Sequence, residues 1–559
     1  MRRTAFFLLT ALALGCNRES PPEEKTGKAE QAAESLTTPS RPNAIRLLEQ
    51  ATFGPNLTDI EHVAPAVGVG VGISGFITEQ LAKPAGTYTG WNADNNAVPP
   101  VVARDVAQDV FEHALTGDDQ LRQRVTLALS QIFVTSLIVV NDQAVMADYL
   151  SMLRRDAFGN FRTLLNDVTL HPMMGRYLNM ANNVAYDTAT PPNLIAPDEN
   201  YAREVMQLFT MGLDELYDDG TVQLDCTGDG LADPPATCTA ATGGKRIPTY
   251  SQANVENLAH ALTGWTYYRL VNGVVKCPAT GARNNTNYTQ PMIACDNNHD
   301  PAAKEILKGK STTQGGTAQA HLTQSLDFLF NDNSTPPYIC KQLIQHLVTA
   351  NPTPGYVSRV VAKFKNNGSG VRGDLSAVIR AILQDDEARG PVPVFAQQAT
   401  YGHLRSPILL ITNAIRWLDG SSTKGATLNS YSNKMGQNIG RAPSVFSFYP
   451  PGFQLPDGSG LLGPEFAIVS SATSLERVNF LNSLFFGTVS GTTLDWTVVP
   501  DDPAAMLQWV DDNIFHDTMS PQMKSIILDA ITNASVPATK RKALALYLAM
   551  TSSDYQTEK

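Results

Sequence analysis

The sequence predicts a mainly α-helical protein, with a multi-helix globular body that carries a small insertion rich in β-structure and disulfides. Apolar residues recur every three or four positions through most of the chain, as at Leu121, Val125 and Leu129, which is typical of core-facing helices. Patterns typical of strands, with Gly, Asn and Pro around them, are confined to residues 266–275 and 287–294. The chain has 559 residues, of which 43% are hydrophobic, so it can bury a large core.

The N-terminus has the features of a bacterial export signal. Two arginines precede an apolar run over residues 5–14, which is shorter than the roughly 20 residues that a membrane-spanning helix needs. Gly15 and Cys16 follow and resemble a bacterial lipoprotein cleavage box. We therefore predict a lipoprotein-type signal peptide over residues 1–16, with Cys16 acylated, for instance by palmitate, as a membrane anchor. An ordinary cleaved signal is the alternative.

The rest of the chain divides into a tether and one large domain. Residues 17–42 are rich in Glu, Lys, Pro, Ser, Thr and Ala, which predicts a disordered tether. Residues 43–559 are predicted to form a single large helical domain with an insertion at 215–310. Apolar periodicity and helix-end signals predict helices at residues 44–52, 73–81, 101–115, 118–134, 142–154, 161–166, 171–181, 198–212, 250–265, 317–330, 337–348, 355–365, 373–384, 403–419, 463–484, 504–514, 521–533 and 540–549.

The helix predicted over residues 198–212 carries the densest set of polar groups. Asp198 is a good N-cap and Gly212 a plausible stop. Glu199 and Arg203 are four residues apart and are expected to pair. Glu204 lies at the edge of the apolar face, where partial burial tends to raise the pKa of a carboxyl group. Glu204 is therefore a candidate general acid or base, or else a buried clamp that holds another helix.

A second set of candidates lies near the end of the next helix. His299 and Asp300 are adjacent, so Asp300 could orient the imidazole as a base or ligand, although a turn-capping role for Asp300 is the alternative. Trp265 would add an aromatic surface beside them. The candidate active centre thus has Glu204, Arg203, His299 and Asp300 as catalytic groups, with Asn200, Tyr201 and Trp265 as binding groups.

The cysteines and a short acidic loop belong to the predicted insertion. In an oxidising compartment the natural local disulfides are Cys226–Cys238 and Cys277–Cys295. Oxygen donors alternate in the loop that starts at Asp225, and Gly230 provides the sharp turn of a calcium loop. The predicted calcium ligands are Asp225, Thr227, Asp229, Leu231 and Asp233. The alternative is a polar loop fastened by the first disulfide.

Several functional classes find no support in the sequence. The net charge of −11 argues against a general nucleic-acid binder. There is no nucleophile elbow, nucleotide-binding loop, dinucleotide fingerprint, zinc-protease motif or haem attachment motif. These absences leave calcium as the only predicted cofactor.

The motifs resemble those of the bacterial domain-of-unknown-function-1800 family. The matching segments are residues 46–55, 199–204, 208–212, 250–255, 261–265, 299–301 and 444–446. Two positions depart from the family pattern: Asp198 replaces an Asn, and Gln207 replaces a Glu, which makes position 207 a poor candidate for an essential carboxylate. The resemblance implies an exported bacterial protein without an agreed activity, often encoded beside an exported sulfatase-like protein.

Two functional hypotheses follow. In the first, the protein is a lipid-anchored hydrolase at the cell envelope that acts on an extracellular polymer, with Glu204 as acid or base. In the second, it is a non-catalytic assembly or partner protein for the co-exported sulfatase-like protein, and the same residues are helix clamps. The hydrolase hypothesis requires Glu204 in an open cleft near His299 or Asp300, whereas the partner hypothesis predicts Glu204 sealed against an arginine.

Overall fold

The computed structural model describes residues 35–88, 105–390 and 400–559. The predicted signal peptide, Cys16 and most of the predicted tether lie outside these ranges, as does the start of the helix predicted at 101–115. Glu34–Lys559 form one compact unit. In the described ranges, no helix combines the length and the apolar character needed to cross a membrane.

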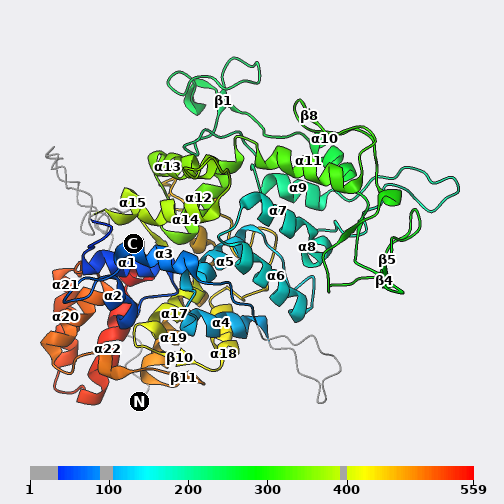
Figure 1. The fold of residues 1–559 in the computed structure, drawn as a ribbon. Helices are drawn as coiled ribbons and strands as arrows, with labels where there is room; N and C mark the ends of the chain where they lie inside the picture. The colour runs from blue at the N-terminus through cyan, green and yellow to red at the C-terminus, as the bar shows by residue number, and fades with distance from the viewer. Residues whose placement is uncertain (1–34, 89–104, 391–399) are drawn as a thin grey trace. The chain divides into compact units, whose positions relative to one another are not determined.

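The N-terminal half of the unit is built from helices around α5. The helices are α1 (Arg41–Ala51), α2 (Leu57–Val63), α3 (Gly72–Ala82), α4 (Val106–Thr116), α5 (Gln120–Ile132), α6 (Gln143–Asp156), α7 (Phe161–Leu170), α8 (Pro172–Tyr177), α9 (Asn200–Gln207) and α10 (Gln252–Ala261). Most of α5 is buried, because α3, α6 and the later helix α12 (Thr335–Leu347) all pack against it (Figure 1). The apolar repeat at Leu121, Val125 and Leu129 is therefore fully buried, as predicted.

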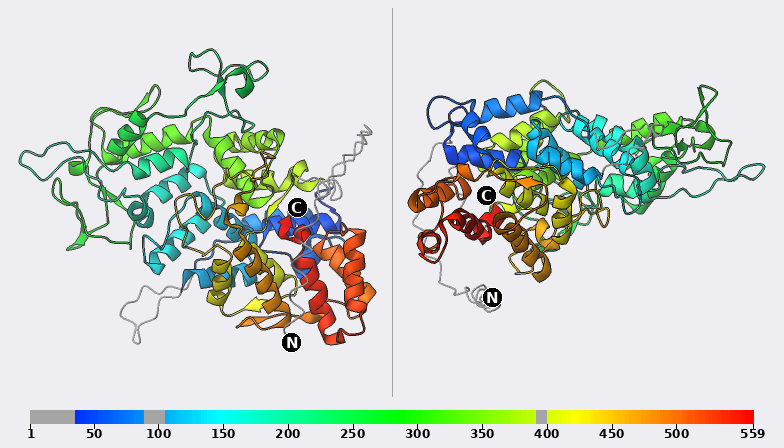
Figure 2. Two further views of the ribbon diagram at one scale, coloured as in Figure 1. Left: turned by 180° about the vertical axis from the view of Figure 1, so that it is seen from behind. Right: turned by 90° about the horizontal axis from the view of Figure 1, so that it is seen from below.

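The C-terminal half adds three further groups of helices. Its helices are α11 (Ala318–Phe330), α13 (Pro354–Lys365), α14 (Leu375–Gln384), α15 (Asp386–Arg389), α17 (Pro407–Arg416), α18 (Gly425–Lys434), α19 (Ser471–Phe486), α20 (Pro503–Ile514), α21 (Pro521–Thr532), α22 (Ala538–Met550) and α23 (Ser553–Gln556). Helices α12, α13 and α14 pack in sequence, α4 packs against α17 and α18, and α22 packs against α19, α20 and α21 (Figure 2).

The β-structure consists of short antiparallel pairs. The pairs are β1 (Leu224–Asp225) with β2 (Lys245–Arg246), β3 (Trp265–Thr266) with β6 (Ile293–Ala294), β4 (Leu270–Val271) with β5 (Val274–Val275), β7 (Glu305–Leu307) with β8 (Lys310–Ser311), β9 (His403–Leu404) with β12 (Thr557–Glu558), and β10 (Ser421–Ser422) with β11 (Thr492–Thr493). Four of these pairs fall in or beside the predicted insertion. The prediction of a mainly α-helical protein with a small β-bearing, disulfide-linked region is confirmed.

Both predicted disulfides are formed. Cys226 bonds to Cys238 and Cys277 bonds to Cys295, while Cys340 is a free and buried thiol. Such bonds form and persist in oxidising compartments and are rare in the cytosol. The disulfide pattern is therefore consistent with an exported protein.

The predicted ends of the tether and of the helix over 198–212 differ from the structure. The predicted tether runs to residue 42, but α1 begins at Arg41 and the carbonyl of Leu36 already accepts a hydrogen bond from Ser74 on α3. The helix predicted over 198–212 ends at Gln207. Beyond it, the amides of Met211 and Gly212 both donate to the carbonyl of Met206, closing a turn in which Gly212 has φ +77°.

The sequence analysis predicts no helix at α18 (Gly425–Lys434). Its sequence is mostly small and polar, so it lacks the apolar periodicity on which the prediction of helices depends. It is held instead by close backbone packing: a side chain on Gly425 would lie 2.3 Å from the carbonyl oxygen of Gln108 in α4.

Candidate functional site

Glu204 is enclosed, but it is not paired with an arginine. Its residue is 9% exposed and its Oε2 is buried without a hydrogen-bond partner. Burial raises the pKa of this carboxyl group, and the nearby charge of Arg203 only partly opposes that rise. The Arg203 guanidinium instead donates to Glu199 at 2.9 Å and to Gln252 of α10 at 3.0 Å. The predicted pair of Glu199 and Arg203 is thus present, and it links α9 to α10.

The charge of Glu204 acts on three tyrosines. Burial first, and then the charge of Glu204, raise the pKa of Tyr177 to about 12, while burial, Tyr250 and Glu204 raise the pKa of Tyr338. Glu204 also raises the pKa of Tyr250, whose hydroxyl donates to Gln207 at 3.3 Å. A side chain on Gly212 would come within 2.7 Å of the Tyr338 ring, so the family glycine permits this close contact. Glu204 is therefore close enough to three phenol groups to affect their ionisation.

His299 and Asp300 are bonded to groups other than Glu204. His299 Nδ1 lies 2.9 Å from the Thr263 carbonyl oxygen and its Nε2 lies 2.9 Å from His321 Nδ1. Asp300 Oδ2 lies 3.0 Å from Lys304 Nζ and 3.1 Å from His260 Nδ1. Across the described ranges, no hydrogen bond or ion pair joins Glu204 to His299 or Asp300. The predicted active centre is therefore divided into two separate polar clusters.

The predicted binding residues have different environments. Tyr201 is buried and its hydroxyl lies 2.6 Å from Thr169 Oγ1, whereas Asn200 is exposed. Trp265 is 2% exposed, pairs with Ala294 in the β3–β6 ladder, and has a buried indole nitrogen without a partner. Tyr201 and Trp265 are thus core residues, and neither presents a surface to a substrate.

The acidic loop folds around its own backbone amides. Asp225 accepts from the amides of Gly228 at 2.5 Å and Gly230 at 2.8 Å, which lowers the pKa of this carboxyl group. Asp233 accepts from the amides of Cys226 and Thr227, and Asp229 accepts from the amide of Leu231. The loop is exposed and tied by the first disulfide. Calcium binding here stays a prediction.

The larger surface hollows are lined by residues outside the predicted centre. A groove of about 850 Å³ runs between residues 216–240 and α13, and a second of about 650 Å³ adjoins α6 and α7. In the second groove His171 has both ring nitrogens occupied, one by the amide of Met173 and the other by Asp148. A cleft of about 480 Å³ beside α2 contains Asp59, whose carboxylate is bound by Arg416 at 2.7 Å. His171 and Asp59 are therefore both bonded to other residues of the protein.

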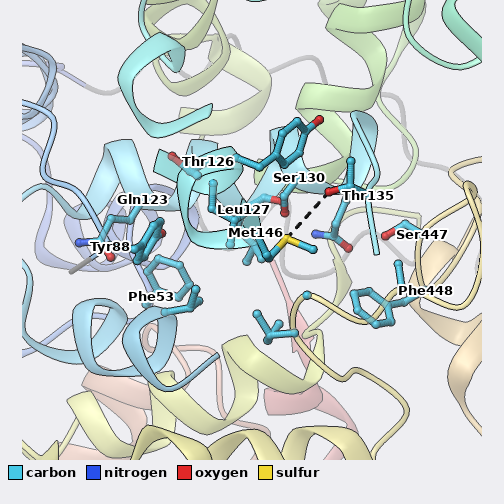
Figure 3. Close-up of a pocket in the computed structure, with 17 residues that line it drawn as sticks. Phe53, Tyr88, Gln123, Thr126, Leu127, Ser130, Thr135, Met146, Ser447 and Phe448 are labelled. Carbon is cyan, nitrogen blue, oxygen red and sulfur yellow. Dashed lines mark hydrogen bonds between the residues drawn. The ribbon is translucent and has the colours of Figure 1, made fainter. Parts of the chain in front are cut away.

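A proline- and aromatic-rich loop at residues 443–451 covers part of the core. Ser447 and Phe448 from this loop help to close a mainly apolar cavity of about 40 Å³, with Met146 and Thr135 on its wall (Figure 3). Thr135 Oγ1 lies 3.9 Å from Met146 Sδ. The space suits one or two waters and is too small for a substrate.

A pocket of about 340 Å³ between α20 and α21 is lined by an imidazole that contacts a buried carboxylate. His516 lines this pocket, and its Nε2 lies 3.4 Å from Oε2 of Glu49, a fully buried residue of α1. Arg405 donates to the other carboxylate oxygen of Glu49 at 2.7 Å. Burial would raise the pKa of Glu49, but Arg405 and His516 outweigh it and lower the pKa to about 2. A carboxylate with a lowered pKa thus lies beside a largely buried imidazole that lines the pocket.

The backbone at this pocket is strained. His516 and Asp517 have φ values of +55° and +61°, in the left-handed region that non-glycine residues rarely adopt. Asp511 holds this turn, since its carboxylate accepts from the amide of Met519 at 2.9 Å and pairs with Lys524. Burial and a hydrogen bond with Asp512 raise the pKa of Asp517 to about 6. The pocket therefore combines a potential base with a potential acid.

Residues 46–557 match the family described as protein of unknown function (DUF1800). The chain belongs to the DUF1800 family. Comparison with curated proteins and with solved structures finds no significant match for this DUF1800 protein.

The family motifs of this DUF1800 protein lie in two different parts of the fold. The segments at 199–212, 250–265 and 299–301 hold α9, α10 and the His299 turn to one another. The segment at 46–55 instead supplies Glu49 to the His516 pocket. Sequence reasoning missed this pocket, although one signal was present: His516-Asp517 is a second His-Asp dipeptide, which lies between two predicted helices.

Proposed function

We propose that this DUF1800 protein is an exported hydrolase of the bacterial cell envelope, which acts on an extracellular polymer at the His516 pocket. The observation that carries the proposal is the contact of the buried Glu49 carboxylate with Arg405 and His516, both of which line the pocket. An orienting carboxylate behind an imidazole that borders a pocket is the arrangement expected of a general base.

The proposed chemistry assigns one proton transfer to each of two side chains. In this proposal Glu49, 3.4 Å from Nε2, favours the tautomer of His516 with its proton on Nε2, which leaves Nδ1 as the base. No described residue hydrogen-bonds to Nδ1. That nitrogen takes a proton from a water molecule, whose oxygen attacks the electrophilic carbon of the substrate. Asp517, with a pKa of about 6, gives a proton to the leaving oxygen. The proton on His516 then returns to Asp517 through solvent.

The test is a screen of glycan, ester and peptide polymers with three variants. His516→Asn removes the base, and we expect a loss of about 100-fold or more in turnover. Glu49→Gln should lower the rate by disturbing the orientation of His516. Glu204→Gln is the matched control, because it neutralises the carboxyl group of the originally predicted centre. Full activity in His516→Asn together with loss in Glu204→Gln would return the active centre to α9.

Export and anchoring are part of the proposal. The two disulfides and the N-terminal sequence support cleavage before Cys16 and attachment of a lipid to that residue. Cells that express the Cys16→Ser variant should release the protein from the membrane fraction and should incorporate no labelled palmitate into it. Unchanged membrane attachment in that variant would contradict the anchor.

A second candidate function is that of a non-catalytic partner for an exported sulfatase-like protein. The observation that favours it is that Arg203, His299 and Asp300 bond to neighbouring residues of this chain and hold elements together. Co-purification of the two proteins, together with a polymer screen that is negative for the wild type, would favour this function over hydrolysis.

A further inference from the structure

Two buried imidazole rings form a continuous hydrogen-bonded chain between two backbone carbonyl groups. His299 is 1% exposed and His321, on α11, is fully buried. His321 Nε2 lies 2.7 Å from the Thr313 carbonyl oxygen, His321 Nδ1 lies 2.9 Å from His299 Nε2, and His299 Nδ1 lies 2.9 Å from the Thr263 carbonyl oxygen. All three separations are normal hydrogen-bond lengths.

The hydrogen bonds fix how many ring protons the two histidines must carry. A carbonyl oxygen can only accept, so His321 Nε2 and His299 Nδ1 must both carry hydrogen. If each ring were neutral, these would be their only ring protons, and the two nitrogens that face each other would both present lone pairs. Lone pairs cannot be held at 2.9 Å without a proton between them. The pair therefore needs three ring protons, which is one more than two neutral imidazoles carry.

Neither a hydroxyl group nor a metal ion supplies an alternative. The Thr263 hydroxyl lies 3.4 Å from His299 Nδ1, but it donates to the His260 carbonyl oxygen at 2.7 Å. A tetrahedral zinc ion at about 2.0 Å from both nitrogens would hold them about 3.3 Å apart, which is wider than the observed 2.9 Å. A shared proton fits the observed distance.

The extra proton belongs on His321. Burial, together with the charge of His321, lowers the pKa of His299, so His299 is the neutral ring that accepts. Asp296 and Asp300 act in the opposite direction on His299 and supply negative charge near the pair. Asp296 also accepts from the amide of Ala318 at the start of α11, and Asp300 is shared with His260 and Lys304. These four groups come from α10 and from the turn at 296–304, and they are the titratable residues placed around the pair in the described part of the chain.

We propose that His299 and His321 form a buried proton-binding site, in which an imidazolium at His321 donates to a neutral His299. The site joins the end of α10, the His299 turn and α11, because its two outer bonds reach Thr263 and Thr313. Loss of the proton at high pH leaves two lone pairs facing each other, which favours opening of this junction. The site makes this junction sensitive to pH and is independent of the proposed hydrolytic activity.

Neutron diffraction from crystals of the full chain near neutral pH tests the proposal directly. We expect deuterium on both ring nitrogens of His321 and on Nδ1 of His299. Two deuterons on the pair, in any arrangement, would overturn the proposal.

Proton release on unfolding provides a second test in solution. An extra proton held by the folded pair at pH 8, where an unfolded histidine is mostly neutral, would leave on unfolding, so the proposal predicts a release of up to about one proton. His321→Gln should release about one proton fewer than the wild type. His62→Gln, which changes an exposed histidine, is the matched control and should match the wild type. Equal release by the wild type and His321→Gln would contradict the site, and if that variant fails to fold, His299→Gln takes its place with the same expectation.

Discussion

Removal of the titrating group at His403 should make the stability of this protein less dependent on pH. His403 is on β9, 4% exposed, with Nδ1 3.3 Å from Glu465 and Nε2 3.7 Å from Glu558. Burial alone would lower the pKa of His403, but the two carboxylates outweigh it and raise the pKa to about 9. Glu558 also accepts a hydrogen bond from Arg405 at 3.3 Å, so the same network connects β12 to a residue that lines the His516 pocket.

The direction and size of this change in stability follow from proton linkage. A histidine whose folded pKa is raised contributes stability that is complete below its unfolded pKa, near 6.5, and is lost as pH rises through about 9. The rise corresponds to about 3 kcal/mol of unfolding free energy. His403→Gln removes the titrating group while preserving the size of the side chain.

Chemical denaturation at several pH values from about 6 to 10 is the assay. As the pH rises across this range, the unfolding free energy of the wild type should fall by about 3 kcal/mol more than that of His403→Gln. His62→Gln serves as the control, since its surface pair with Glu79 contributes little to stability. Parallel stability curves for the wild type and His403→Gln would refute the charge network as described.

Three further predictions concern other parts of the fold. In denaturant titrations, Gly212→Ala should lower the unfolding free energy by about 2 to 4 kcal/mol, because Gly212 has φ +77° and a side chain there would meet Tyr338. The control Gly309→Ala, with φ +73° and open space around it, should lower it by only about 1 kcal/mol, and equal losses would contradict the Tyr338 contact. The double change Cys277→Ser and Cys295→Ser should lower the unfolding free energy by about 3 kcal/mol, and an unchanged denaturation midpoint would count against this disulfide as a stabilising bond. Calcium should raise the melting temperature of the wild type and leave Asp225→Asn unchanged, and a melt that a chelator does not shift would remove calcium from the acidic loop.

Helices with regular apolar spacing could be predicted from the sequence. The repeat in α5 predicts burial because three packing helices cover it on several sides. Helix α18 could not be predicted, since it is held by the close approach of Gly425 to α4, and such a contact leaves no periodic signal. The end of α9 was misplaced because Gly212 closes a wider turn that extends beyond the last helical residue.

The site was harder to predict for a different physical reason. Arg203 and Glu204 are adjacent in the sequence, as are His299 and Asp300, and these short polar motifs favoured them as a centre. The His516 pocket joins residues separated by more than 400 positions, because Glu49 lies on α1 and His516 follows α20. Sequence spacing carries no information about such a contact. The carboxylate at residue 49 is also hidden among apolar neighbours within α1.

The most direct test of the central claim is the rate of polymer cleavage by wild type, His516→Asn and Glu204→Gln, each confirmed as folded by its melting curve. We expect one polymer class to be cleaved by the wild type and Glu204→Gln at similar rates, and by His516→Asn at least about 100-fold more slowly. Cleavage that is unaffected in His516→Asn, or a folded wild-type protein that cleaves no polymer in the panel, would contradict it.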